Sequence, residues 1–355
     1  MGPQASSFEP SSSQRPPAIA KARLSSTASQ EEISLIEGDN LEALRCLALE
    51  IPQTVTLAYL DPPFLTGRTH HRVTRKRTKL GYDRSSRPAF DDRWDSLEHY
   101  TAALKERIAV VRELLAPWGS MVLHVDAKTS HYLKVACDQI FGRDCFASEV
   151  IWRYRRWPSK TKNFQKVHDV MLRYVKDPAA TPRFNQLYEP LAASTLRTWG
   201  DKKQRAVTDS TGRRLRSSST IEKSRGTPLG DVWEIGIVAP VAKERTGYPT
   251  QKPEALLRRW LEACSDPGDL ILDPYMGSAT TLLCAAQLGR RAIGIDQGLD
   301  AHEIAQRRLA AANIAHSHRR VLPKPTPGKK PPPPQALPGP VRGASANREQ
   351  RSAIA

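Results

Sequence analysis

Short segments with the character of buried strands recur along the chain, and segments of helical periodicity separate them. A run of four to eight mainly apolar residues is typical of a strand that is buried on both faces. Strands that alternate with helices predict an α/β fold, with a mostly parallel sheet and helices on both of its faces. The predicted strands are residues 55–60, 120–125, 149–154, 170–175, 270–272 and 291–295, and the predicted helices are residues 100–115 and 281–288.

Two polar ends flank this pattern. Residues 1–30 are rich in Ser, Pro and Gln, and residues 318–355 combine the run Pro331–Pro334 with many basic residues. Such compositions bury too little apolar surface to fold, so both ends are predicted to be disordered. One folded domain is therefore expected over residues 31–317.

Two polar, basic stretches interrupt the expected domain. Residues 65–93 are strongly basic, and residues 177–230 are basic and weakly periodic. Each stretch is long for a plain connection, and long loops in compact domains are usually functional or disordered.

Charge and cysteine usage narrow the class of protein. The 355 residues include 54 Lys and Arg against 37 Asp and Glu, which gives a formal net charge of +17. This excess favours a polyanionic partner, although a solvated basic surface with a basic tail would have the same composition. The five cysteines form no CxxC pair or Cys/His cluster, so neither a metal site nor a disulfide framework is expected. Neither a run of transmembrane length nor a signal peptide is visible, which favours a cytoplasmic protein.

The motif Asp61-Pro62-Pro63-Phe64 follows directly on the predicted strand 55–60. Open α/β sheets bind their ligands at the carboxyl ends of strands. The two prolines fix the backbone and remove two N–H donors, which leaves a rigid turn with carbonyls beside a carboxylate. This turn suits an aromatic amine, because Asp61 and the Pro62 carbonyl can each accept an amine hydrogen while Phe64 stacks on the ring. The alternative is a stiff surface turn with a buried aromatic.

A second turn follows the predicted strand 270–272. Residues 273–281 read DPYMGSATT and lead into a predicted helix. Gly277 allows a tight turn, and the free N–H groups of a helix N-terminus attract ligand groups. Roughly twenty residues further on, Asp296 ends the next predicted strand, which is the spacing of an acid that hydrogen-bonds ribose hydroxyls. The turn and the acid together predict a nucleotide-type cofactor.

This order of motifs, with the catalytic turn first and the cofactor loop last, resembles the beta class of amino-group DNA methyltransferases. The resemblance covers residues 31–315 and implies a Rossmann-like, S-adenosylmethionine-dependent methyltransferase fold with a permuted motif order. It also implies a prokaryotic, nucleoid-associated protein. The further stretches that resemble the family are Glu37–Leu41, Phe90–Trp94, His168–Val170, Asp231–Glu234 and Tyr248–Pro253.

The resemblance implies S-adenosylmethionine as the cofactor. Asp273 would pair with its methionine ammonium, Asp296 with its ribose and Asp39 with its adenine amine, and Tyr275 would contact the purine or wall the methyl-donor pocket. Asp39 and Asp273 would also suit the caps of helices or turns. The cofactor-binding residues implied in this way are Asp39, Thr250, Lys252, Asp273, Tyr275, Gly277, Ser278, Thr280 and Asp296.

One position departs from the family pattern, since many members carry glycine where this chain has Ala279. Alanine would be strained there if the backbone needs a positive φ, and harmless if the helix has already begun. We expect the helix to have begun.

DNA contacts are assigned to the two basic stretches. In the family, target recognition usually lies between the late strands and the Thr-Gln-Lys-Pro segment, here residues 177–230. The cluster from Trp152 to Trp157 is expected either to line the same cleft or to present the two faces of a strand. The predicted DNA-binding residues are Arg75, Lys76, Arg77, Arg213, Arg214 and Arg216, any of which could instead belong to a solvated loop.

The sequence therefore predicts a methyltransferase that acts on N6 of an adenine flipped out of double-stranded DNA. Family members that act on cytosine more often carry Ser at the position of Asp61, so adenine is preferred over N4 of cytosine, and RNA or another amine is a further alternative. A rival hypothesis of a different class is a non-catalytic DNA-binding protein with a methyltransferase fold. The departure from the family pattern at Ala279 keeps this hypothesis open. A homodimer and a restriction endonuclease partner are also expectations from the family.

Overall fold

The computed structural model describes residues 33–321, apart from residues 79, 80, 159, 161, 214, 216 and 217 and the side chains of residues 74–84, 218 and 219. The predictions for residues 1–30 and for the tail from residue 322 onward lie outside the described residues. No helix in the described part is both long and apolar enough to span a bilayer.

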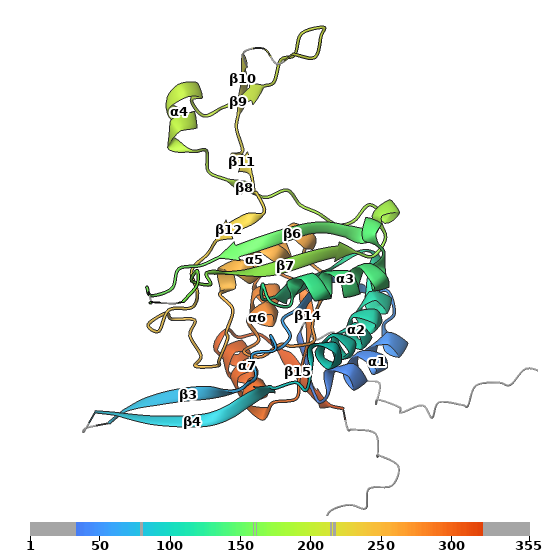
Figure 1. Ribbon diagram of the computed structural model, residues 1–355, viewed down its shortest axis with the longest axis vertical. Coiled ribbons are helices and arrows are strands. Elements are labelled where there is room, and N and C mark those ends of the chain that lie inside the picture. The colour runs from blue at the N-terminus through green and yellow to red at the C-terminus, as the bar shows by residue number, and fades with distance from the viewer. Residues whose placement is uncertain are drawn as a thin grey trace, which may run out of the picture. The chain divides into compact units, whose positions relative to one another are not determined.

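A nine-stranded sheet forms the centre of the domain (Figure 1). In spatial order its strands are β12 (Val232–Glu234), β6 (Phe146–Arg153), β7 (His168–Val175), β5 (Leu115–Val125), β2 (Val55–Leu60), β13 (Leu270–Asp273), β14 (Arg291–Asp296), β1 (Ile33–Glu37) and β15 (His316–Arg320).

Only β7 runs antiparallel to its neighbours in this sheet, β5 and β6. The other neighbouring strands pair in parallel. A parallel sheet is covered on both faces, which explains why all six residues of β2 are buried. The predicted mostly parallel α/β sheet is confirmed, and each of the six predicted strands is present.

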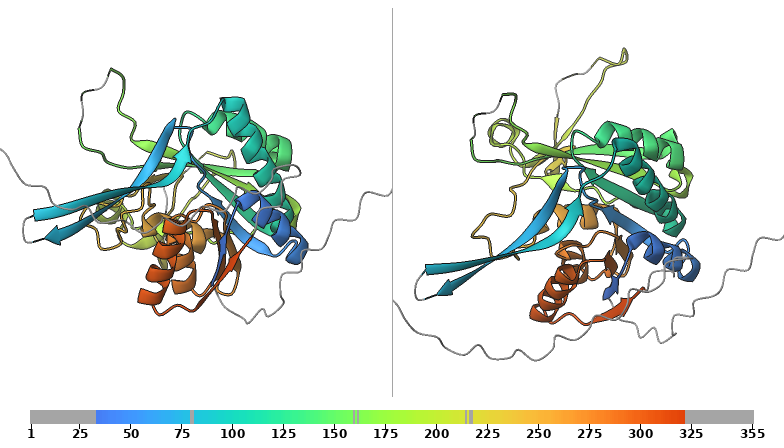
Figure 2. Two further views of the ribbon diagram at one scale, coloured as in Figure 1. Left: turned by 90° about the horizontal axis from the view of Figure 1, so that it is seen from below. Right: turned by 60° about the horizontal axis from the view of Figure 1, so that its bottom comes forward.

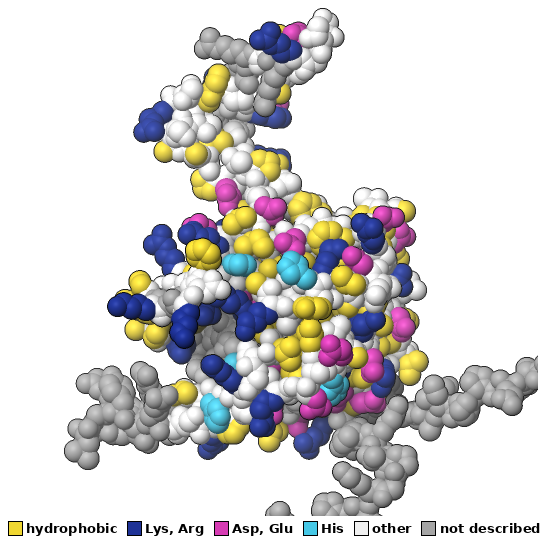
Figure 3. All heavy atoms as spheres, viewed as in Figure 1, with side chains coloured by type: hydrophobic (Ala, Val, Ile, Leu, Met, Phe, Trp, Pro, Cys, Tyr) yellow, Lys and Arg dark blue, Asp and Glu magenta, His cyan; other side chains and the backbone are white. Residues whose placement is uncertain are grey.

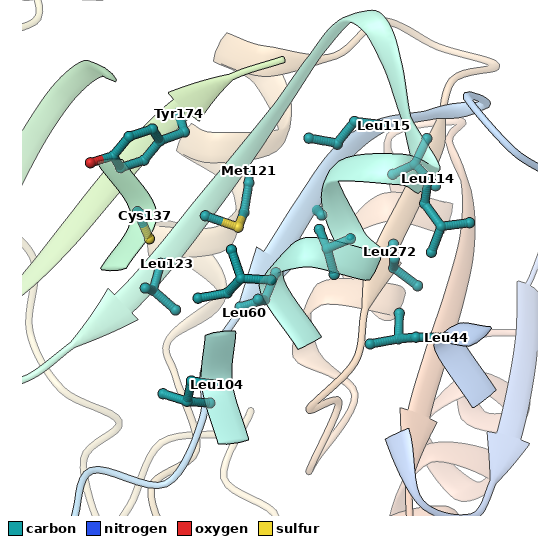
Figure 4. Packing of buried hydrophobic residues seen from close by; sticks show 14 of the residues in the cluster. Leu44, Leu60, Leu104, Leu114, Leu115, Met121, Leu123, Cys137, Tyr174 and Leu272 are labelled. Carbon is teal, nitrogen blue, oxygen red and sulfur yellow. The ribbon is translucent and has the colours of Figure 1, made fainter. Parts of the chain in front are cut away.

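Helices cover both faces of the sheet. Leu60 of β2 and Leu123 of β5 pack in one core cluster with α1 (Asn40–Glu50), α2 (Leu97–Leu114) and α3 (Ser130–Phe141) (Figure 4). Leu57 and Val122 of the same strands point the opposite way. They pack in a second cluster with α5 (Glu254–Cys264), α6 (Thr280–Gln287) and α7 (Leu299–Ala311). Alternation along each strand thus divides the apolar residues between two cores.

The folded domain ends later than expected. Residues 316–320 form the edge strand β15, which pairs in parallel with β1, and the compact unit extends to Val321. The expected boundary at residue 317 is therefore wrong by a few residues. The segment is polar because an edge strand is half exposed, and ion pairs of Arg320 with Glu37 and of Arg319 with Glu50 hold it.

The two interrupting stretches have regular structure of their own. The first contains the antiparallel hairpin of β3 (Arg68–Thr78) and β4 (Gly81–Asp92). The hairpin extends beside α7 (Figure 2), where Arg72 pairs with Asp300. The second holds the short elements β8 (Tyr188–Glu189), α4 (Ala193–Trp199), β9 (Lys202–Arg205), β10 (Ser218–Lys223) and β11 (Thr227–Pro228).

The centre of the sheet places the two sequence motifs side by side. β2 and β13 are adjacent and parallel, with Leu272 in register with Ala58. Their carboxyl ends therefore meet at one edge, where Asp61 and Asp273 lie. This edge is where ligands bind in open α/β sheets.

The expectation for Ala279 is wrong. Helix α6 begins at Thr280, and Ala279 is its N-cap residue with φ 58° and ψ 32°, in the left-handed region. The Ala279 N–H donates to the Met276 carbonyl at 2.7 Å, which closes a tight turn between β13 and α6. The short connection requires a left-handed residue before the helix, and alanine fills a position that suits glycine.

The backbone strain at Ala279 can be measured with one substitution at two sites. Ala279→Gly and Ala285→Gly both remove a fully buried methyl group, but Ala285 lies inside α6. Glycine within a helix costs about 1 kcal/mol, whereas a left-handed alanine costs roughly 1–2 kcal/mol. In urea unfolding we expect Ala279→Gly to be the more stable variant by at least about 1 kcal/mol. Equal losses would show that Ala279 is unstrained.

Candidate active site

One cavity of about 250 Å³ lies at the carboxyl edge of the sheet. Every predicted catalytic residue and every predicted cofactor-binding residue lines it. These residues are Asp61, Pro62, Pro63 and Phe64, together with Asp39, Thr250, Lys252, Asp273, Tyr275, Gly277, Ser278, Thr280 and Asp296.

The catalytic turn is held by the carboxylate of Asp92, at the end of β4. The backbone N–H groups of Phe64, Leu65 and Thr66 donate to Asp92 at 3.1, 2.9 and 2.9 Å. The Tyr100 hydroxyl donates to the Pro63 carbonyl at 2.8 Å. Asp92 also lines the cavity, and sequence reasoning did not assign it to the site, although it lies in the family-like stretch Phe90–Trp94.

The Asp61 carboxylate has two different environments. Its Oδ2 accepts a hydrogen bond from the ammonium of Lys252. Its Oδ1 is buried and has no hydrogen-bond partner among the residues that the structure describes. Lys252 also lies 5.1 Å from the centroid of the Phe64 ring. The structure thus places Lys252, predicted as a cofactor residue, directly on the catalytic turn.

A buried polar network, formed by residues of β2, β5 and β7, lies next to Asp61. His124 has 0% exposure and shares a 2.7 Å hydrogen bond with the Tyr59 hydroxyl. Its Nδ1 lies 3.9 Å from Asp61 Oδ1, and its Nε2 lies 3.5 Å from Asp169. Burial, followed by the negative charge of Asp61, raises the pKa of Tyr59 well above its usual range. Sequence reasoning did not assign Tyr59 and His124 to the site. The sequence marks them only as residues with polar groups inside two otherwise apolar strands.

The cofactor loop is built around the carboxylates of the buried Asp273 and the partly buried Asp296. Asp273 is 3% exposed, and its Oδ1 accepts the Tyr275 N–H at 3.0 Å. Asp296 accepts the Gly277 N–H at 3.0 Å and the Gly298 N–H at 2.8 Å. Burial raises the pKa of Asp273 to about 7 and also raises the pKa of Asp296.

Gly277 is required for close packing as well as for its turn. Its φ is 47°, and a Cβ atom built there would lie 3.0 Å from the ring of Tyr248. That ring stacks with Phe90 of β4 at 6.3 Å, and Phe90 stacks with His70 of β3 at 4.6 Å. An aromatic wall therefore joins the base of the hairpin to the cofactor loop.

Asp39 caps a helix and also lines the cavity. It is the N-cap of α1, where its Oδ1 accepts the N–H groups of Leu41 and Glu42 at 2.9 and 3.1 Å. Its Oδ2 lies 3.3 Å from Arg107, and the residue lines the cavity. The capping role is present, and the contact with an adenine amine stays a prediction.

Arg213 is the predicted DNA-binding residue whose side chain the structure describes, and it does not line the cavity. Arg213 is exposed between β9 and β10. Arg214 and Arg216 lie outside the described residues, and so do the side chains of residues 75–77 on β3. In the cluster 152–157, Trp152 and Tyr154 are buried while Arg153 and Arg155 are exposed, so this part presents two faces, with β6 ending at Arg153.

The fold and the cavity define a Rossmann-like methyltransferase with a permuted motif order. A family model described as DNA methylase, covering N6 and N4 methyltransferases, matches residues 55–307. The chain belongs to this family of DNA methyltransferases, which use S-adenosylmethionine as methyl donor and DNA as substrate.

Curated relatives match most of the chain. The type II methyltransferase M.ScaI of Streptomyces caespitosus is 32% identical over 299 residues, which cover 79% of this chain and 82% of that protein. The DNA adenine methyltransferase YhdJ of Escherichia coli (strain K12) is 28% identical over 284 residues, covering 80% and 84%. Among solved structures, the complex of M1.HpyAVI with S-adenosylmethionine is 18% identical, with a TM-score of 0.47, and covers 78% of this chain and 98% of that one.

The residues present fit this cofactor. S-Adenosylmethionine supplies a methyl group on a positively charged sulfur, and it also carries an ammonium group. The cavity offers the carboxylates of Asp39, Asp61, Asp273 and Asp296. These acids would balance the cofactor's positive charges, and Thr280 at the N-terminus of α6 lines the same space.

The raised pKa of Asp273 predicts that cofactor affinity depends on pH. A pKa of about 7, against the ordinary 3.8, means that Asp273 becomes protonated as pH falls through 7. Only the carboxylate can pair with an ammonium, so we expect the cofactor Kd to rise about tenfold for each pH unit below 7. Calorimetric titration from pH 8 to pH 5.5 measures this slope.

The matched variant is Asp273→Asn, which keeps the shape and removes the titration. It is expected to bind the cofactor weakly at every pH and to lose most of the slope. An unchanged slope in this variant would assign the pH dependence to another group.

Proposed function

We propose that this protein methylates N6 of adenine in double-stranded DNA, and that the target nucleotide leaves the duplex to enter the cavity. The observation that carries the proposal is that Asp61 and Phe64 line the same cavity as the cofactor loop, with Asp61 Oδ1 left without a hydrogen-bond partner among the described residues. An exocyclic amine of a base is the donor that this acceptor suits.

Two considerations favour adenine over cytosine. Asp61 stands where family members that act on cytosine more often carry Ser. The relative YhdJ is named a DNA adenine methyltransferase, and its similarity extends over 80% of this chain. Duplex DNA follows from the family and from the net charge of +17.

The recessed position of Asp61 supports extrusion of the base. Asp61 is the first residue of the turn, and its side chain is only 17% exposed. An atom inside a base pair cannot approach such a group, and enzymes that modify bases turn the nucleotide out of the stack. Phe64 would then pack against the extruded ring, since aromatic side chains stack on bases at about 1–3 kcal/mol each.

The residues of the turn orient the amine rather than deprotonate it first. One amine hydrogen donates to Asp61 Oδ1 and the other to the Pro62 carbonyl, which directs the nitrogen lone pair toward the methyl group. Bound S-adenosylmethionine would supply the methyl group for the new N–C bond, and its sulfur would keep the electron pair of the C–S bond. The extra proton on nitrogen then leaves through the hydrogen bond to Asp61. Lys252 fixes the second oxygen of Asp61 and so sets the orientation of the carboxylate.

The reaction is tested by methyl transfer to unmethylated genomic DNA, with the modified nucleosides identified by mass spectrometry. We expect N6-methyladenine from the wild type and a rate at least about 10²-fold lower in Asp61→Ala, because an aligned electrostatic contact in an active site is worth about that much. Asp95→Ala is the control, since it removes an exposed carboxylate outside the cavity.

The other outcomes are equally clear. N4-methylcytosine would keep the mechanism and change the target base. Tight binding of DNA and cofactor without any methylated base would support the rival hypothesis, a DNA-binding protein that has the methyltransferase fold but no activity. Methylation of RNA alone would show that RNA, and not DNA, is the substrate.

The hairpin of β3 and β4 is proposed to contact phosphates through Arg75, Lys76 and Arg77. Each phosphate contact adds about 0.9 to the slope of log K against log salt. The triple alanine variant is therefore expected to lower that slope by roughly 2–3 for a duplex of any sequence. Fluorescence anisotropy between 50 and 300 mM NaCl measures it.

The control removes Arg143 and Arg291, two exposed residues near the amino edge of the sheet. Substituting them with alanine is expected to leave the slope within about 0.5 of the wild type. A similar decrease in both variants would mean that net charge alone, and not the hairpin, sets DNA affinity. The homodimer and the endonuclease partner stay predictions from the family.

A further inference from the structure

The loop between β6 and β7, residues 154–167, lies at the same edge as the catalytic turn. β6 is antiparallel to β7, and β7 is antiparallel to β5, so β6 ends on the edge where β5 and β2 end. Lys166 anchors the loop there, since its ammonium lies 2.8 Å from Asp126, directly after β5. The cavity does not include any residue of this loop.

Two aromatic side chains of the loop are almost fully exposed. Trp157 is 91% exposed and Phe164 is 99% exposed, whereas Trp152 and Tyr154 just before them are buried. The Gln165 side chain donates to the Trp157 carbonyl at 2.8 Å, so the two limbs of the loop are joined close to both aromatics. Burying a large aromatic side chain is favourable, and these two gain almost none of that burial among the described residues.

Exposed cations flank the two aromatics in the sequence. Arg155, Arg156, Lys160 and Lys162 are all exposed, and residues 154–167 contain no acidic residue. Figure 3 shows apolar side chains among Lys and Arg on this side of the molecule, where the loop lies in Figure 1. A basic surface of this kind attracts a polyanion. Exposed aromatic side chains among cations can also stack on nucleic-acid bases.

We propose that Trp157 and Phe164 enter the base stack of duplex DNA and occupy the gap that the target nucleotide leaves. The proposal rests on the proposed function, because only an extruded base leaves such a gap beside Asp61. The four cations hold the phosphates on either side, and the aromatics stack on the two bases that lost their neighbour. Apolar side chains that enter base steps stabilise an opened duplex in this way.

A duplex with a gap already in place tests the loop without any methylation. Affinity is measured for an intact duplex and for the same duplex with one abasic site. Opening the stack costs a few kcal/mol in the intact duplex and less at an abasic site. We expect the wild type to bind the abasic duplex at least about fivefold more tightly, since stacking on one base is worth about 1–3 kcal/mol, and we expect the fluorescence of Trp157 to be quenched.

The variants assign the preference to the loop. Trp157→Ala combined with Phe164→Ala is expected to bind both duplexes equally, and Trp157→Phe is expected to keep most of the preference. Trp118→Ala is the matched control, because Trp118 is 43% exposed but lies toward the amino end of β5, away from this edge. Unchanged cofactor affinity in all variants excludes a folding defect.

Three results would overturn the inference. They are a wild type without preference for the abasic duplex, a double variant that keeps the preference, and an equal loss in Trp118→Ala. If the double substitution changes the oligomeric state in sedimentation and leaves DNA binding unchanged, the loop is instead an interface between copies of the chain. Failure of the proposed function has a separate signature, since a wild type that prefers the abasic duplex but yields no methylated base contradicts the enzyme and not the loop.

Discussion

The parallel pairing of β2 with β13 determines where chemistry is possible in this protein. The two strands come from opposite ends of the domain, and each ends in an Asp-Pro turn. Because neighbouring parallel strands end at one edge, Asp61 and Asp273 open into a single cavity. The permuted motif order has no effect on this result, since the sheet depends on which strands are neighbours and not on the order in which the chain supplies them.

The cavity concentrates negative charge in a chain with an excess of positive charge. Asp61, Asp273 and Asp296 lie close enough that the charge of Asp61 and that of Asp296 both help to raise the pKa of Asp273, after burial itself. Lys252 balances one of the three acids, while backbone N–H groups satisfy much of the rest. A positively charged cofactor would reduce the repulsion among these carboxylates. In the free protein, that repulsion is the cost of a site that suits a cation.

Local patterns predicted much of this structure, and long-range contacts account for what was missed. The strands 55–60 and 270–272 and the motif residues could be located because apolar runs and turns are encoded locally. The ion pair of Lys252 with Asp61 and the clamp of Asp92 on the catalytic turn join segments that are far apart in sequence. Ala279 was misjudged for another reason, since alanine itself favours a helix and only the glycine of the family pattern pointed to its positive φ.

The clamp by Asp92 also determines how the hairpin can vary. Asp92 is the last residue of β4 and pairs with Arg68, the first residue of β3, so the base of the hairpin is part of the catalytic turn's support. The tip lies at the far end of a two-stranded ladder. Residues added in pairs at the tip would lengthen the arm and leave the base in register, whereas a single added residue would turn one strand over. The length of the hairpin can therefore change in even steps without disturbing the support of the catalytic turn.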